Sequence, residues 1–80
     1  MFINKADDGM NNICGRNVAA LRKKMRISQR ELADRLQLLG LDLDKNAIQR
    51  MESGKRFVTD IELITIKQFF NISFDELLAE

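Results

Sequence analysis

A short run of polar side chains in the middle of the chain has the chemistry to bind the edges of nucleic acid bases. Arginine and lysine can donate hydrogen bonds to O6 and N7 of guanine, and asparagine and glutamine can pair with N6 and N7 of adenine. If the run is helical, with Ala47, Ile48 and Met51 turned inward, its polar residues lie together on the outer face. These polar residues are Lys45, Asn46, Gln49 and Arg50. The alternative interpretation is a polar helix face that is merely solvated.

Few residues of the chain are suited to catalysis or metal binding. The chain has no histidine, which removes the commonest general base and the commonest metal ligand. It contains no paired-cysteine motif and no glycine-rich phosphate-binding or dinucleotide-binding motif. Its acidic residues are scattered among expected helix starts and exposed positions. The sequence therefore predicts a protein that is not an enzyme and that uses no metal, cofactor or small-molecule ligand.

The net charge of +1 hides an uneven distribution of charge. Residues 16–56 carry eleven lysines and arginines against five acidic residues, whereas residues 57–80 carry one lysine against five acidic residues. A basic middle followed by an acidic end is typical of a face that binds a polyanion and a back that the polyanion repels. An ordinary solvated surface with uneven charge explains the same distribution equally well. Charge alone therefore leaves both interpretations open.

The polar run has to be positioned by helices, and the sequence marks where the helices begin. Three segments, 27–32, 58–63 and 72–77, share the pattern apolar-Ser/Thr-x-x-Glu-Leu. In such a capping box the hydroxyl accepts from the amide three residues on, the glutamate reaches back to the cap amide, and the flanking apolar pair packs together. Asp44 repeats the cap without the glutamate. The expected helices are 28–39, 44–53, 59–70 and 73–79.

A further helix is expected at 12–25, with Asn12 as its N-cap. Its apolar residues form one stripe at helical spacing: Cys14, Val18, Leu21 and Met25. We interpret Cys14 as a small core residue; it is the only cysteine, so no internal disulfide can form, and a lone thiol fits a reducing cytoplasm. No segment shows the alternation of a strand. The predicted fold is an all-α five-helix bundle behind a flexible tail at 1–11, in a cytoplasmic protein without a membrane segment.

Four segments of the chain match a known pattern: CGRNVAALR (14–22), ISQRELA (27–33), IQRMESGKR (48–56) and ISFDELL (72–78). With them, the chain from Ile13 onward resembles the Cro/repressor-type helix-turn-helix family, also called the xenobiotic-response-element family. The combination of Ser-Gln-x-Glu-Leu-Ala with x-x-Glu-x-Gly-Lys-Arg is specific, whereas either half alone would be weak. The resemblance implies a lambda-repressor-like DNA-binding domain over residues 12–80.

The resemblance also implies a function and the residues that carry it. We expect a sequence-specific transcriptional regulator, a repressor, that binds double-stranded DNA and reads the major groove with a recognition helix at 44–53. The family uses the positions of the four polar residues named above. Gln29, at the start of the second helix, would present its backbone amide and side chain to a phosphate. Lys55 and Arg56, just past the recognition helix, would grip the DNA backbone.

Other residues of the pattern have expected structural roles. Gly54 would end the third helix, where a positive φ is favoured. Arg22 and Glu52 both lie beside the core, and we expect a buried or half-buried ion pair between them that joins the first helix to the end of the third. The resemblance points to the same pair. The space between the second and third helices would be filled by Leu32, Ala33, Leu36, Ile48 and Met51.

Two features depart from the pattern of the family. The link at 36–43 is longer than usual, and we expect it to extend the second helix by a turn before Gly40 closes it. The angle at which the recognition helix meets the groove depends on this link. Val58 stands where the family usually has proline, and we expect no large consequence.

Apolar residues left over on the fourth helix favour self-association. Ile61 and Ile64 point away from the face that packs inward, and Phe69 lies on a flank. We expect a homodimer on DNA that reads a pseudo-palindromic operator with half-sites about one helical turn, roughly 34 Å, apart. Alternatively, Ile61 or Phe69 packs against Phe2 and Ile3 within one chain.

A function of another class also fits the sequence. The chain could be a protein-interaction module, such as an antitoxin or a regulator that sequesters another protein. Titration of duplex DNA at low and at high salt discriminates between the two functions, since only DNA binding depends on counterion release.

Overall fold

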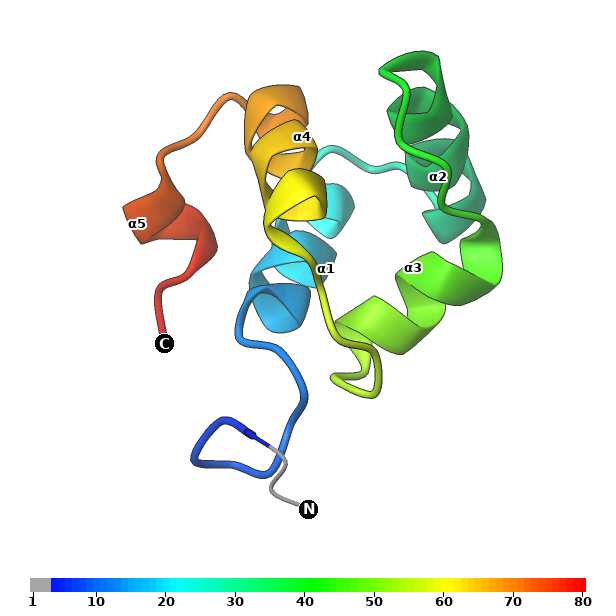
Figure 1. Ribbon diagram of the computed structural model, residues 1–80. Helices are drawn as coiled ribbons and strands as arrows, with labels where there is room; N and C mark the ends of the chain where they lie inside the picture. Colours follow the sequence, from blue (N-terminus) through cyan, green and yellow to red (C-terminus); the bar gives the residue numbers. More distant parts are fainter. Residues whose placement is uncertain (1–3) are drawn as a thin grey trace.

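The computed structural model describes residues 4–80, which form five α-helices and no strand (Figure 1). The helices are α1 (Cys14–Lys24), α2 (Gln29–Leu38), α3 (Lys45–Glu52), α4 (Asp60–Phe70) and α5 (Phe74–Leu77). This confirms the predicted all-α five-helix fold. None of these helices is long and apolar enough to cross a membrane.

The predicted caps start the helices. Ser28, Asp44, Thr59 and Ser73 each accept a hydrogen bond from the backbone N–H three residues on. Asn12 does the same for α1, where its Oδ1 accepts from Gly15 at 2.8 Å. Each cap satisfies one of the amides that a helix start leaves without a partner. The predicted first position of each of these four helices is therefore the cap itself, and the helix begins one residue later: α2, α3, α4 and α5.

The reciprocal half of the capping box forms in only one of the three predicted cases. Glu62 reaches back to the N–H of Thr59 at 2.9 Å. In α2 the carboxylate of Glu31 instead lies 3.9 Å from Arg35, and in α5 Glu76 lies 3.4 Å from the hydroxyl of Ser73. Both carboxylates are exposed, so water can replace the bond to the cap amide. The prediction of three complete boxes was wrong in this detail.

Four helices end in the same way, with a residue in the left-handed conformation. These residues are Arg26, Gly40, Gly54 and Asn71. After α2, for example, Leu41 donates to the carbonyl of Leu36 and Gly40 donates to that of Gln37, which is a Schellman motif. The two glycines were predicted to end their helices. Arg26, with φ 60°, was not predicted, because arginine carries no preference for this conformation.

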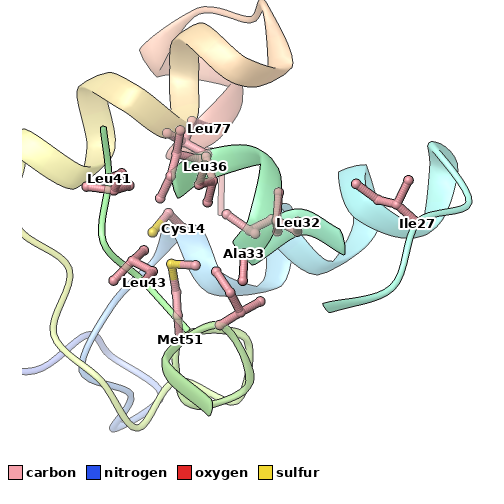
Figure 2. Packing of buried hydrophobic residues seen from close by; sticks show 12 residues of the cluster. Cys14, Ile27, Leu32, Ala33, Leu36, Leu41, Leu43, Met51 and Leu77 are labelled. Atoms are coloured by element: carbon pink, nitrogen blue, oxygen red, sulfur yellow. The ribbon is translucent and has the colours of Figure 1, made fainter. Parts of the chain in front are cut away.

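One hydrophobic core joins the helices, and α2 and α3 supply much of it (Figure 2). Every residue predicted to lie between these two helices is buried. Cys14 is also buried, as interpreted from the sequence, and burial raises the pKa of its thiol to about 11. The stripe on α1 ends earlier than expected, because Met25 is 42% exposed beyond the last residue of the helix.

The long link between α2 and α3 contributes to the core. Leu41 and Leu43 are buried, and Figure 2 shows both among the side chains of the cluster. Gln37 fastens the link, since its Nε2 donates to the carbonyl of Leu43 at 3.0 Å. α2 ends at Leu38, and Gly40 closes it with φ +89°, so the predicted closure at Gly40 is confirmed. The two leucines of the link therefore form an apolar plug in the hydrophobic core.

α1 lies between the two ends of the molecule. It packs against α3 on one side and against α5 on the other, so α2 and α3 form one end of the molecule and α5 the opposite end (Figure 1). α5 is shorter than predicted and stops at Leu77, where Nδ2 of Asn17 binds the carbonyls of Leu77 and Ala79. The basic residues of α2 and α3 and the acidic residues of α5 therefore lie at opposite ends of the molecule, whereas Arg56 of the basic middle and Glu62 of the acidic end form an ion pair.

The segment before α1 was expected to be a flexible tail at 1–11. Residues 1–3 lie outside the described part, and with them the proposed contact of Phe2 and Ile3 with α4. Residues 6–10 form a closed turn, in which Ala6 donates to the carbonyl of Met10 at 2.9 Å. Asn11 then reaches the loop after α3, where its N–H donates to the carbonyl of Gly54 at 2.8 Å. The mobility of the segment remains a prediction.

Candidate nucleic-acid interface

The outer face of α3 carries a continuous set of hydrogen-bonding side chains. Ile48 and Met51 are fully buried and Ala47 is half-buried, so the helix turns its other side outward. That exposed side holds Lys45, Asn46, Gln49 and Arg50. The structure thus brings the four predicted base-reading residues together on one face.

Two hollows flank the start of α3. One, of about 340 Å³, lies between α2 and α3 and is lined by Arg30, Lys45 and Asn46 among others. The other, of about 350 Å³, lies on the opposite flank and is lined by Asn46, Arg50 and Arg56 among others. Asp44 and Asn46 line both hollows, and Asp34 lines the first. The start of α3, which is the part of a recognition helix that enters a major groove, is therefore flanked by donors together with two carboxylates.

A network of hydrogen bonds holds α3 against α1 and α2. Arg22 and Glu52, expected as a pair, make two bonds, Nε to Oε2 at 2.7 Å and Nη2 to Oε1 at 3.0 Å. Both side chains are largely buried, and Arg22 also donates to the carbonyl of Ile27 at 2.9 Å. The bond to Glu52 raises the pKa of the Arg22 guanidinium above its usual value. The pair therefore fixes the end of α3 to the end of α1.

Gln29 belongs to the same network. Its Nε2 donates to Oε1 of Glu52 at 3.0 Å, which ties the first residue of α2 to the last residue of α3. Ser28 caps Glu31 and not Gln29, so the cap leaves the backbone N–H of Gln29 unused at the helix start. The side chain expected on a phosphate is thus engaged inside the protein, whereas the amide keeps the geometry for an anion.

The guanidinium of Arg56, which is expected to grip the DNA backbone, is bound within the protein to Glu62. Its Nη1 and Nη2 each lie 2.8 Å from an oxygen of Glu62, and Nη1 also donates to the carbonyl of Phe57. Glu62 is buried, and the Arg56 guanidinium, helped by the N–H of Thr59, lowers the pKa of its carboxyl below the ordinary value. In this structure Arg56 therefore fastens the loop after α3 to the start of α4.

Lys55 and Arg30 are the exposed basic residues next to α3. Lys55 follows Gly54, and its backbone is bound: its N–H donates to the carbonyl of Arg50 at 2.9 Å, and its carbonyl accepts from Nδ2 of Asn11 at 2.9 Å. Within residues 4–80, no ion pair involves either side chain. Arg30 was missed in the sequence, although its place directly after Gln29, in the first turn of α2, was a usable signal.

Comparisons with known proteins place this arrangement in context. A family model described as helix-turn-helix matches residues 18–77, three quarters of the 80 residues. The match includes all of α2, α3 and α4, and it begins within α1. A search of curated proteins found no match, and a search of solved structures found none either.

Proposed function

The chain belongs to the Cro/repressor-type helix-turn-helix family and is thus a DNA-binding regulator, and on that premise we propose that it is a sequence-specific repressor of transcription. It reads double-stranded DNA by inserting α3 into the major groove. The observation that carries the proposal is the exposed face of α3, where four side chains with hydrogen-bond donors lie together.

In this proposal the residues divide into two groups. Lys45, Asn46, Gln49 and Arg50 contact base edges and set the sequence that is bound. Lys55, Arg30 and the backbone N–H of Gln29 contact phosphates and set the position of the domain on the duplex. Arg56 is assigned to neither group, because it lines the hollow beside Arg50 but its guanidinium is bound to Glu62.

The protein binds its operator as a homodimer. Four base-reading side chains are few for tight specific binding, and two-fold symmetry doubles them. Ile61 and Ile64 support this arrangement, since they are 70% and 47% exposed on α4. Isolated exposed apolar residues are common, but two on one helix face favour a contact surface. The operator is a pseudo-palindrome with half-sites roughly 34 Å apart.

Selection of bound sequences from a random duplex pool tests the proposal. We expect one enriched, pseudo-palindromic sequence and an affinity that falls steeply with salt, because bound lysines and arginines release counterions. Enrichment of no sequence, together with the absence of binding at low salt, would contradict the function.

Substitutions test the division between the two groups. Arg50→Ala and Asn46→Ala should each cost about 1–3 kcal/mol at particular base positions. Lys55→Ala should weaken binding to all sequences and reduce the salt slope by about one unit. Lys67→Ala, which removes the one lysine of residues 57–80, is the control and should change neither quantity. The same uniform loss from Arg50→Ala and Lys55→Ala would argue against the division.

A further inference from the structure

The side chain of Asn12 connects the start of α1 to the end of the recognition helix. Its Oδ1 accepts from the N–H of Gly15 at 2.8 Å. Its Nδ2 donates to the carbonyl of Met51 at 3.1 Å and to the carbonyl of Arg56 at 2.7 Å. Both hydrogens of the amide are thus used, one within α3 and one beyond the turn at Gly54. A single carboxamide therefore joins three backbone segments.

Asn11 completes the contact from the neighbouring position. Its N–H donates to the carbonyl of Gly54 at 2.8 Å, and its Nδ2 donates to the carbonyl of Lys55 at 2.9 Å. Of the four acceptors, only the carbonyl of Met51 lies in α3, and it also accepts from the N–H of Gly54 at 3.1 Å; the other three lie in the loop after the helix. The two asparagines therefore fasten the last turn of α3 and the loop after it to the segment before α1.

The backbones at this contact approach closely. A Cβ on Gly15 would lie 2.0 Å from the carbonyl oxygen of Met51. A Cβ on Gly54 would lie 2.4 Å from the sulfur of Met10. At Gly15 any side chain would collide with a backbone carbonyl, so glycine lets α1 approach the end of α3 closely, whereas the neighbour of Gly54 is the end of a flexible side chain. The Asn12 bonds lie at this close approach and, together with the Arg22–Glu52 pair, join α1 to α3.

We infer that Asn12 is a positioning residue for DNA recognition: it sets the orientation of α3 against α1 and the path of the loop that carries Lys55. The inference rests on the proposed function, but Asn12 lies outside the part matched by the family. Hydrogen bonds to base edges demand an aligned helix, whereas contacts between lysine and phosphate tolerate displacement. Loss of the Asn12 bonds should thus reduce specific binding more than non-specific binding.

Asn12→Asp is the most direct test. The aspartate keeps an acceptor for Gly15 but replaces the donating amide with an oxygen that faces two carbonyl oxygens. We expect the affinity for the selected operator to fall by about tenfold or more, the cost of about one good base contact, and the affinity for an unrelated duplex to fall by less than about threefold. The ratio of operator affinity to unrelated-duplex affinity is measured for the wild type and for Asn12→Asp, at one salt concentration and at a temperature where both are folded.

Asn17→Asp is the matched control. Nδ2 of Asn17 also donates to two carbonyls, those of Leu77 and Ala79, each at 2.7 Å, but these belong to the end of the molecule away from α3. The same chemical change there should lower the melting temperature and leave the ratio of specific to non-specific affinity unchanged. Asn12→Ser, which keeps an acceptor for Gly15 without the repulsion, replaces Asn12→Asp if the latter does not fold.

Amide chemical shifts of the protein without DNA give an independent readout. Asn12→Asp should shift the amides of residues 45–56, and Asn17→Asp those of residues 74–79. Equal effects of the two variants on the affinity ratio, or an unchanged ratio in Asn12→Asp and Asn12→Ser, would overturn the inference. Failure of the wild-type protein to select any sequence would instead overturn the proposed function, and the two failures are distinct.

Discussion

At the scale of single residues, Glu52 is the acceptor that joins α1 and α2 to the end of α3. It accepts from Arg22 twice and from Gln29 once, and it is largely buried. Glu52→Ala leaves the Arg22 guanidinium unpaired against the core, so we expect the free energy of unfolding to fall by about 3–5 kcal/mol. Glu31→Ala, in an exposed pair 3.9 Å from Arg35, should cost less than about 1 kcal/mol. Urea denaturation measures both, and an unchanged midpoint for Glu52→Ala would contradict the assignment.

The Arg56–Glu62 pair makes stability depend on pH. Because the pKa of Glu62 is lowered in the folded protein, mainly by its bond to Arg56, the folded state favours the carboxylate. Its contribution to stability is present above the unfolded pKa and is lost as the pH falls through the folded pKa. We expect Glu62→Gln to be less stable than the wild type near neutrality and to lose less stability on acidification. Thermal unfolding from pH 7 to pH 3 measures this, with Glu80→Gln as an exposed control that should follow the wild-type curve.

The exposed polar face of α3 could be predicted from the sequence residue by residue, but the bond of Arg56 to Glu62 could not. The face follows from helical spacing, since Ile48 and Met51 fix which side of α3 is inward. The partner of Arg56 depends on the path of the loop between α3 and α4. The sequence shows Glu62 only as the third helical residue of a capping box, a role that it also performs. Nothing in the spacing of the sequence indicates that Glu62 also binds Arg56.

At the scale of elements, helix starts were easier to predict than helix ends. A start is marked by a side chain that bonds to its own helix, so Ser28, Asp44 and Thr59 are readable locally. An end depends on which residue accepts a positive φ. Gly40 and Gly54 were visible in the sequence, whereas Arg26 adopts φ 60° although it is not glycine.

The link between α2 and α3 offers a test at the same scale. Leu41→Ala should lower the free energy of unfolding by about 2–5 kcal/mol, because Leu41 is 8% exposed and its truncation leaves a cavity in the core. Leu38→Ala, on the same link at 87% exposure, should change stability by less than about 0.5 kcal/mol. Thermal or urea denaturation measures both variants. Equal effects would show that the link does not pack as an apolar plug.

At the scale of the whole molecule, the apolar face of α4 leads to a prediction of stoichiometry. Sedimentation with an operator duplex should give two copies of the chain per site at saturation. Ile61→Asp places a charge in the proposed contact, so it should weaken binding to the full operator while leaving binding to a single half-site unchanged. Leu38→Asp, an equally polar change at an exposed leucine of α2, is the control. One copy per site at saturation would refute the dimer.

The overall topology could be predicted, but the contacts between distant segments could not. The number and order of helices follow from caps and apolar stripes, which are local signals. The docking of residues 10–12 onto the end of α3 joins positions 39 to 44 residues apart. Asparagine and glycine in the sequence fit a loose tail as well as a docked one, so no pattern distinguished the two.

The contacts of Asn12 and Asn17 also bear on the order of events during synthesis. Asn12 leaves the ribosome 44 residues before Arg56, and Asn17 leaves it 62 residues before Ala79. The C-terminal cap of α2, by contrast, joins Leu36 to Leu41, so it can form as soon as Leu41 has emerged. α1 is therefore synthesised before the segments that it docks against, the loop after α3 and the end of α5. In a nascent chain arrested before residue 51, α2 and its link should therefore be packed together while α1 remains undocked. The exposed face of α3 should reach its final orientation only after residue 51 has emerged.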